Sequence, residues 1–278
     1  MNNINNSKHT QIIADDWNKG SDKYYARIYS GGELDEIIAN PIWAFPDSVR
    51  IMLREAYGEA VDLRGKRVLV PSSGDNGAVF AFHLLGAKVR SADISERQLH
   101  NARRIAEENG WDISFIQADS MKLEGIDDGA YDLVYTSNGV HVWINDLAAM
   151  YSSFHRVLKK GGRYIMFETH PFIRPFDGEA ADEGRFVVKK LYEELGPFGE
   201  VPTMAWRIMD IINALAGSGF AVRHMEEFHS QRDTFDCWWY STTEEAIADD
   251  FAKFDIKRNP WVALPQWIGL SAVKEEKQ

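Results

Sequence analysis

From Lys66 onward the chain alternates short apolar runs with helix-forming segments, and this alternation limits the fold more than any other feature. The runs "KRVLVP" (66–71), "KVRSADI" (88–94) and "YDLVYTS" (131–137) predict strands. The segments "AVFAFHLLGA" (78–87) and "SERQLHNARRIAEENG" (95–110) predict helices between them. Strand–helix–strand alternation favours a mostly parallel sheet with helices on both faces. The sequence therefore predicts an α/β fold.

The helix predicted at 95–110 carries its own start and stop signals. Ser95 and Gln98 have the spacing of a capping box, and Gly110 is placed to end the helix. Leu99, Ala102 and Ala106 form one apolar stripe, which we expect to face the sheet.

The second half of the chain repeats the pattern less regularly. "DLAAMYSSFHRVLKKGG" (146–162) predicts a helix and "RYIMFETH" (163–170) a strand. Further on, "RIMDIINALAGSG" (207–219) predicts a helix, and "FAVRHMEEF" (220–228) and "QWIGLSAVK" (266–274) predict two strands. We expect these last two strands to pair antiparallel at one end of the sheet.

The segments outside this pattern define the expected domain organisation. Residues 1–60 are predicted to form an N-terminal helical cap or lid, with breaks at Gly31-Gly32 and Pro41. Residues 61–278 are predicted to form the core domain. Two irregular segments, at about 171–206 and 229–264, are predicted to be lid-like insertions in that core because they interrupt the regular pattern with glycine, proline and aromatic residues.

Charge and cysteine content limit the partners and the compartment. The formal net charge of −11 disfavours nucleic acid as a partner, because a polyanion is repelled. The single cysteine, Cys237, cannot form an intrachain disulfide, and the N-terminus lacks the layout of a secretory signal. No apolar run approaches the roughly 18 residues of a membrane span. We expect a cytoplasmic protein, a monomer or a homodimer, without a membrane partner or a metal site.

The loop after the first predicted strand indicates the kind of ligand. Dinucleotide folds use G-x-G-x-x-G there, whereas "PSSGDNG" (71–77) offers only Gly74 and Gly77. Asp75 places a negative charge where a pyrophosphate would lie, which costs affinity by repulsion. A ligand with an ammonium or sulfonium group and no phosphate suits the same turn. Ser72 and Asn76 are small and polar, and asparagine tolerates left-handed backbone angles.

Two further acids follow the next two strands. Asp93 ends the second strand, about 20 residues after the loop, where a carboxylate accepts hydrogen bonds from both ribose hydroxyls. Asp119 and Ser120 end the third, which is predicted from "DISFIQAD" (112–119), and there a carboxylate or the backbone is placed to bind an adenine amino group. Ribose and adenine without phosphates point to S-adenosylmethionine.

With these residues in place, the stretch from about Lys66 to Pro171 resembles a class I S-adenosylmethionine-dependent methyltransferase of the ubiquinone/menaquinone-biosynthesis-like group. "YDLVYTSNGVHVWIND" (131–146) is similar to the fourth motif of that group, and "FHRVLKKGGRYIMFE" (154–168) to the fifth. A looser likeness continues through 209–227 and 264–274. The resemblance implies a Rossmann-like, doubly wound, seven-stranded sheet with an antiparallel last strand, and S-adenosylhomocysteine as product.

The first motif departs from the family. Where the family usually has Asp-x-Gly-x-Gly-x-Gly, this chain has Val70, Ser72, Gly74 and Asn76. The acid of the family is therefore missing from its usual place, and we expect Asp75 to substitute for it.

The predicted site combines these residues with positions carried over from the resemblance. His141 matches the histidine of the family after the fourth strand and is the first candidate for a general base, and His170 is the second; the alternative for each is a histidine that only hydrogen-bonds the loop. Aromatic residues outside the core suit a lid over an apolar or cationic ligand, which suggests Tyr25, Phe172 and Trp206 at the substrate. The residues expected to bind the cofactor are Ser72, Gly74, Asp75, Asn76, Asp93, Ile94, Gln98, Asp119, Ser120, Met121, Asn138, Val140 and Trp143.

The predicted function is therefore methyl transfer from S-adenosylmethionine to an oxygen or nitrogen of a small molecule, in a closed, aromatic-lined pocket. Two alternatives remain. The protein is a non-catalytic S-adenosylmethionine-binding regulator, or it is a nicotinamide-dependent oxidoreductase, which the missing third glycine and Asp75 disfavour.

Overall fold

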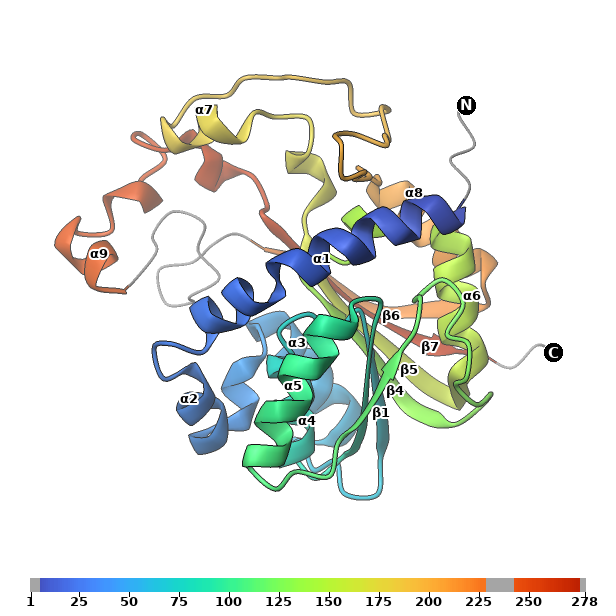
Figure 1. The fold of residues 1–278 in the computed structure, drawn as a ribbon. Helices are drawn as coiled ribbons and strands as arrows, with labels where there is room; N and C mark the ends of the chain where they lie inside the picture. Colours follow the sequence, from blue (N-terminus) through green and yellow to red (C-terminus); the bar gives the residue numbers. More distant parts are fainter. Residues whose placement is uncertain (1–5, 229–242, 276–278) are drawn as a thin grey trace.

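A single seven-stranded sheet forms the centre of the protein in the computed structural model, which describes residues 6–228 and 243–275. The strand order is β3-β2-β1-β4-β5-β7-β6 (Figure 1). β1 to β5 pair in parallel, whereas β7 pairs antiparallel with both β5 and β6. The prediction of a mostly parallel, doubly wound sheet with an antiparallel last strand is confirmed.

The predicted strands lie where the apolar runs placed them. The strands are β1 (Arg67–Pro71), β2 (Lys88–Asp93), β3 (Ser114–Gln117), β4 (Tyr131–Ser137), β5 (Leu158–Thr169), β6 (Phe220–Phe228) and β7 (Trp267–Lys274). The α-helices are α1 (Asn6–Ile28), α2 (Glu33–Ala39), α3 (Asp47–Tyr57), α4 (Gly77–Leu84), α5 (Glu96–Glu108), α6 (Leu147–Val157), α7 (Gly178–Asp182), α8 (Ile208–Gly217) and α9 (Thr243–Ala248). Short 3-10 helices are η1 (Pro41–Ala44), η2 (His141–Trp143), η3 (Pro171–Ile173), η4 (Ala252–Phe254) and η5 (Pro260–Ala263).

The two faces of the sheet are buried under different helices. In β1, Val68 and Val70 belong to the core that includes α3, α4 and α5, whereas Leu69 belongs to the core that includes α6 and α8. The same alternation separates Ile165 from Tyr164 in β5. Because successive strand residues point to opposite faces, this apolar alternation requires helices on both sides.

The junction of α6 and β5 corrects one prediction. The helix predicted to continue to Gly162 ends at Val157, and Leu158 is already extended and pairs with Tyr131 of β4. The pairing shifts register between Tyr131 and Leu133, and Gly161 has a φ of 71°. The irregular start lets "LKKGG" join the strand, because glycine takes left-handed angles without a Cβ clash.

The N-terminal helices cover one side of this sheet. α1, α2 and α3 are separated near Gly31-Gly32 and Pro41, as the breaks predicted. α3 packs on β5 and β7, and α1 packs along α5. Figure 1 shows α1 as a long helix that crosses one end of the sheet.

The two insertions extend from the sheet end that α1 crosses. The first runs from η3 through α7 to α8, and the described part of the second contains α9, η4 and η5. Residues 229–242 of the predicted insertion at 229–264, and Cys237 with them, lie outside the described residues. Within residues 6–228 and 243–275, no helix has the length and apolar character of a membrane span.

Gly269 of β7 provides a test of the contact between this strand and α3. A methyl group on Gly269 would lie 2.7 Å from Ser48 Oγ and 3.2 Å from Met52 Cε. We expect Gly269→Ala to lower the free energy of unfolding by about 1–3 kcal/mol, because overpacking displaces these neighbours.

The matched control is Gly217→Ala at the end of α8, where such a methyl group meets nothing within 4 Å. We expect this variant to be neutral or more stable by up to about 1 kcal/mol. Urea unfolding curves measure both, and equal stability of the two variants would contradict the packing.

Candidate functional site

The loop between β1 and α4 makes a tight left-handed turn without the usual glycines. Ser72, Gly74 and Asn76 have φ values of 50°, 54° and 64°. Asn76 is fully buried, and its Nδ2 donates to Gly74 O at 2.8 Å and to Tyr25 Oη at 2.9 Å. Its Oδ1 accepts a bond from Ser91 Oγ at 2.6 Å. Asn76 thus allows the turn and also fixes it to α1 and β2.

Three tyrosines, two in α1 and one directly after it, contact the same loop from outside the sheet. Tyr25 Oη donates to Gly74 O at 3.0 Å, Tyr29 Oη donates to Asp75 O at 2.6 Å, and Tyr24 Oη lies 3.5 Å from Asp75 Oδ2. Tyr25, expected at the substrate, is 4% exposed and is not part of the wall of any of the three large cavities described below. In this structure it supports the loop.

Asp93 ends β2 beside this loop. Its Oδ2 accepts a bond from Gly74 N at 3.1 Å, and its Oδ1 accepts one from Ser95 N at 2.8 Å. Burial raises the pKa of Asp93 to about 6, and the backbone hydrogen bonds from Ser95 and Gly74 only partly oppose this shift. The carboxylate is therefore fixed in position and costly to ionise, so donors from a ligand would stabilise its charge.

A cavity of about 420 Å³ lies where the loop, Asp93 and the chain after β4 meet. This volume falls within the usual range of small-molecule sites, roughly 300–1,000 Å³. Eight of the predicted cofactor residues are part of its wall: Ser72, Gly74, Asp75, Asp93, Ile94, Asn138, Val140 and Trp143. We call it the cofactor cavity.

The other five predicted cofactor residues lie around this cavity, not in its wall. Asn76 is buried behind the loop, and Gln98 accepts a bond from Ser21 Oγ at 3.2 Å. Ser120 Oγ lies 2.8 Å from Ser72 Oγ and so supports a residue of the wall. Asp119 Oδ1 accepts a bond from Met121 N at 2.9 Å. The roles of these five residues in cofactor binding stay predictions.

The cofactor cavity also has wall residues that the sequence analysis missed, among them Ile13, Trp17, Tyr24, Thr169 and Arg174. The aromatic content of the N-terminal cap was a signal for Trp17 and Tyr24. Trp17 joins the two sides of the wall, with ring centroids 5.6 Å from Tyr24 and 5.8 Å from Trp143, both edge to face. Nothing in the sequence marked Arg174.

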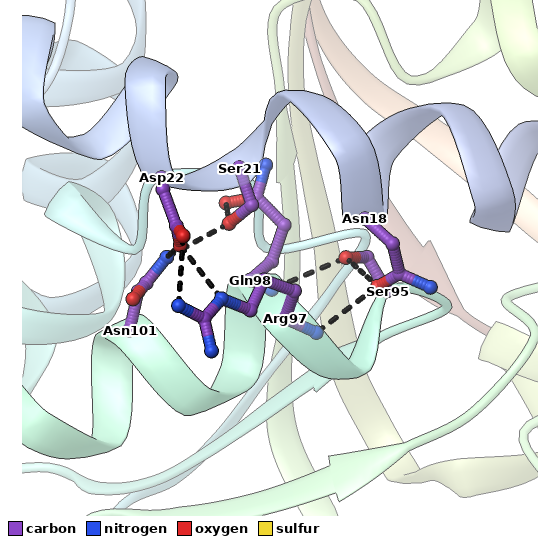
Figure 2. A network of polar contacts seen from close by, with 7 residues as sticks. All are labelled: Asn18, Ser21, Asp22, Ser95, Arg97, Gln98 and Asn101. Carbon is purple, nitrogen blue, oxygen red and sulfur yellow. Dashed lines mark hydrogen bonds and ion pairs between the residues drawn. The ribbon is translucent and has the colours of Figure 1, made fainter.

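A polar network fixes α1 over the N-terminal half of α5 (Figure 2). Arg97 binds both carboxylate oxygens of Asp22 at 2.7 Å, and Asn101 Nδ2 donates to Asp22 at 2.9 Å. These two side chains lower the pKa of Asp22 to about 2. One turn earlier, Asn18 Oδ1 accepts bonds from Ser95 Oγ and Arg97 N at 2.7 and 3.1 Å. Since α1 also provides part of the cavity wall, this network connects the wall to α5.

The loop after β4 is organised by a buried carboxylate. Glu168 of β5 accepts bonds from the backbone N–H groups of Gly139 (3.0 Å), Val140 (2.7 Å) and His141 (3.1 Å). Burial by itself would raise the pKa of Glu168, but the ring and backbone amide of His141, together with the charge of Arg174, outweigh it and hold the pKa below its ordinary value. Glu168 is thus a buried anion that fixes the loop beside the cofactor cavity.

Both ring nitrogens of His141 lie close to buried polar side chains. Its Nδ1 lies 3.1 Å from Glu168 Oε1 and its Nε2 lies 2.6 Å from Tyr151 Oη. His141 is buried, and it is part of the wall of a cavity of only about 10 Å³. The catalytic role predicted for His141 stays a prediction, and the geometry favours a structural one.

The remaining predicted residues lie in the first insertion and at its base. His170 Nδ1 accepts a bond from Phe172 N at 3.1 Å, and its Nε2 lies 2.9 Å from Glu227 Oε1. The Phe172 side chain is 45% exposed. Trp206 Nε1 donates to Ile144 O at 2.8 Å, and its ring is part of the wall of the small cavity beside His141. The three residues are not part of the cofactor cavity wall, so their roles stay predictions.

Two larger cavities share wall residues with the cofactor cavity. One of about 560 Å³ lies under α2, η1 and α3 and shares Asp75, Ala78, Ser137 and Asn138 with it. The other, about 470 Å³, lies against the first insertion and shares Val142 and Arg174. We call them the cap cavity and the insertion cavity. Across the part of the chain that the structure describes, no group of three or more His, Cys, Asp or Glu residues is arranged to hold a metal ion.

Comparisons with known proteins agree with this geometry. Residues 72–162 match a family model described as a methyltransferase domain. A demethylmenaquinone methyltransferase of Thermus thermophilus is 32% identical over 120 residues, which are 42% of this chain and 54% of that protein. An uncharacterised methyltransferase of Bacillus subtilis is 30% identical over 129 residues, 46% of this chain and 49% of that protein. The chain thus spans about half the length of these relatives.

Solved structures share the fold over a larger part of the chain. A magnesium protoporphyrin IX methyltransferase of Synechocystis, solved with S-adenosylhomocysteine, covers 96% of this chain and all of its own at a TM-score of 0.59 and 18% identity. An S-adenosylmethionine-dependent methyltransferase of Mesorhizobium loti covers 81% of this chain and 97% of its own at a TM-score of 0.57 and 22% identity. The domain match, these relatives and the shared fold support a class I S-adenosylmethionine-dependent methyltransferase.

The cofactor cavity fits the ligand of this family. Asp93 offers a carboxylate to ribose hydroxyls, and a methyl group placed on Gly74 would meet nothing within 4 Å, so the turn is open to close approach. Asp75 adds a negative charge and Trp17 and Tyr24 add ring faces, which attract a sulfonium ion. The residues present therefore suit S-adenosylmethionine.

The pKa of Asp93 makes ligand binding depend on pH. Ribose hydroxyls donate to the ionised carboxylate, so binding favours loss of the proton, and affinity should rise with pH through about 6 and level off above it. With a pKa of about 6, some nine-tenths of Asp93 is protonated at pH 5. We expect S-adenosylhomocysteine to bind roughly tenfold more weakly at pH 5 than at pH 8, by calorimetry. A pH-independent affinity would contradict this role of Asp93.

The network in Figure 2 predicts how fast a ligand leaves. Asp22→Ala removes the partner of Arg97 and Asn101 and should loosen α1, which forms part of the cavity wall. We expect S-adenosylhomocysteine to dissociate several-fold faster, since the bonds that hold α1 against α5 at this point are lost. Glu108→Ala is the control, because it breaks the Arg104–Glu108 pair on α5 away from this network. Stopped-flow tryptophan fluorescence measures both rates, and an unchanged rate in Asp22→Ala would contradict the coupling.

Proposed function

We propose that this protein transfers a methyl group from S-adenosylmethionine to an oxygen or nitrogen of a small molecule. The observation that supports the proposal is that the cofactor cavity shares wall residues with two further cavities, so room for a second reactant lies beside the first. In this proposal Asp93 holds the ribose, and Asp75 and the aromatic wall face the sulfonium. Positioning and exclusion of water would supply most of the rate.

The chemistry needs few dedicated groups. When bound, S-adenosylmethionine supplies an electrophilic methyl group: a lone pair of the acceptor forms the bond to carbon while the electron pair of the C–S bond returns to sulfur. An acceptor hydroxyl or ammonium must also lose a proton. Asp75 is the titratable residue that faces both the cofactor cavity and the cap cavity, and burial raises its pKa. In our proposal Asp75 accepts that proton more readily than His141, whose ring nitrogens contact Glu168 and Tyr151.

A small acceptor and a cytoplasmic location are part of the same proposal. The net charge of −11 disfavours a nucleic acid substrate, and the single cysteine gives no intrachain disulfide. The nicotinamide-dependent alternative is not favoured, because the matched domain is that of a methyltransferase. A non-catalytic regulator is not favoured either, since two cavities with room for an acceptor adjoin the cofactor cavity.

Substitution of Asp93 tests the proposal. We expect Asp93→Ala to weaken S-adenosylmethionine binding by about 100-fold or more, because two hydrogen bonds to a charged group are lost, each worth roughly 1.5–3 kcal/mol. The variant should keep the thermal stability of the wild type or exceed it, since a buried carboxylate with a raised pKa is removed.

The control is Asp127→Ala, which removes an exposed acid on another loop. Calorimetry gives the affinities, and transfer of a tritiated methyl group to a pool of small alcohols, phenols and amines gives the activity. Full affinity in Asp93→Ala would exclude the proposed binding mode, and wild-type protein that binds the cofactor but methylates nothing in the pool would favour the regulator.

A further inference from the structure

The insertion cavity is basic, although the chain as a whole is acidic. Its charged wall residues are Arg174, Lys189, Lys190 and Glu194, three cations against one acid, whereas the chain carries a net charge of −11. Its apolar wall includes Val142, Phe198 and Met204. A local excess of positive charge inside a negatively charged protein attracts anions to one place.

Arg174 links this cavity to the cofactor cavity, because its side chain is part of the wall of both. The guanidinium has no hydrogen bond or salt bridge to any residue that the structure describes. Burial lowers the pKa of Arg174, and Glu168 opposes this shift only through its charge. The oxygens of Glu168 accept bonds from three backbone amides instead.

An arginine in this state is unusual. A guanidinium carries five N–H donors and stays charged, and a half-buried charge without a hydrogen-bonded partner still has to be hydrated or paired. A planar anion with two oxygens satisfies such donors best, because carboxylates and phosphates accept two parallel bonds from one guanidinium.

The two lysines extend the positive charge away from Arg174. Lys190 Nζ donates to Glu194 O at 2.9 Å and lies 5.3 Å from the centroid of the Phe198 ring. Burial lowers the pKa of Lys190, and Glu194 opposes the shift, while Arg174 and Lys189 lower the pKa further through charge repulsion. The three cations therefore repel one another, and an anion between them would relieve that repulsion.

Backbone hydrogen bonds stabilise the segments around the insertion cavity. Met204 N donates to Val142 O at 2.7 Å, which joins the insertion to the loop after β4. Phe198 and Thr203 exchange two backbone bonds of 2.9 Å. These bonds fix the backbone of Phe198 and Met204, whose side chains form part of the apolar wall of the cavity.

We propose that the insertion cavity binds the carboxylate or phosphate of the methyl acceptor, with Arg174 and Lys190 as the residues that hold the anion. This inference rests on the proposed function, and it adds the chemical class of the acceptor: a small molecule with one anionic group and an apolar body. Arg174 is a positioning residue here, because it fixes the anion beside the cofactor cavity and so orients the acceptor atom toward the methyl group.

Four ligands with a phenyl ring test this assignment: phenylacetate, phenyl phosphate, 2-phenylethanol and phenethylamine. They are titrated calorimetrically into protein saturated with S-adenosylhomocysteine at constant ionic strength. We expect at least one of the two anions to bind about tenfold or more tightly than the alcohol, and the amine to bind most weakly. The stronger of the two anions identifies the acceptor group as a carboxylate or a phosphate.

Variants show which residues hold the anion. Arg174→Met and Lys190→Met should each weaken anion binding about tenfold and leave the alcohol unchanged, and Arg174→Lys should recover part of the loss. Lys88→Met, at the exposed start of β2, removes a positive charge elsewhere and is the control. Thermal unfolding confirms that each variant is folded. If Arg174→Met does not fold, Lys190→Met still tests the assignment.

The result that overturns the inference is equal binding of anion and alcohol, or no saturable binding of either anion up to about 10 mM. A second outcome also overturns it: if Arg174→Met weakens S-adenosylhomocysteine but not 5′-methylthioadenosine, which lacks the amino acid, Arg174 serves the cofactor. Wild-type protein that fails to bind S-adenosylhomocysteine at all would instead count against the proposed function.

Discussion

The buried amide of Asn76 is the interaction on which the cofactor cavity depends. One side chain bonds the turn after β1, a tyrosine of α1 and a serine of β2, so it joins three parts of the chain that are far apart in sequence. A glycine at this position would allow the same left-handed turn but would make none of these bonds. The changed first motif thus exchanges backbone freedom for side-chain hydrogen bonds.

Two buried carboxylates complete the cavity by the same physical means. Asp93 and Glu168 lie at the ends of β2 and β5, and each accepts hydrogen bonds from the backbone amides of a neighbouring loop. The two carboxylates differ in how far their partners offset the effect of burial on the pKa. Glu168 also faces His141 and has a lowered pKa, whereas Asp93 has a raised one. Glu168 is therefore satisfied within the protein, while Asp93 still gains from additional donors, which suits a ligand-binding group.

The distribution of charge separates the two cavities beside the cofactor cavity. The cap cavity contains Glu33, Asp47 and Asp75 with one arginine, and that arginine pairs with Asp47. The insertion cavity has three cations and one acid. An anionic group is repelled from the cap cavity and attracted to the insertion cavity. Electrostatics therefore favours the insertion cavity as the place for an anionic acceptor.

The sequence by itself determined the sheet and the position of the cofactor cavity. Alternation of apolar residues fixed the strands, and parallel strands bring their carboxyl ends to one edge, so Gly74, Asp75 and Asp93 were predictable as neighbours. The prediction of secondary structure was wrong at Leu158–Gly162. The segment "LKKGG" has no strand pattern, and it joins β5 only through its pairing with β4.

Tertiary structure alone decided which polar groups remain available. His141 is a plausible base in sequence, but its Nε2 lies 2.6 Å from Tyr151 Oη and its Nδ1 3.1 Å from Glu168 Oε1, so both ring nitrogens lie in the buried interior. Arg174 has no sequence signal, and only the fold leaves its guanidinium without a hydrogen-bond partner among the described residues, between two cavities. Periodicity encodes burial, whereas the pairing of a donor with an acceptor depends on contacts between distant segments. For that reason the sequence could place the site but could not assign its chemistry.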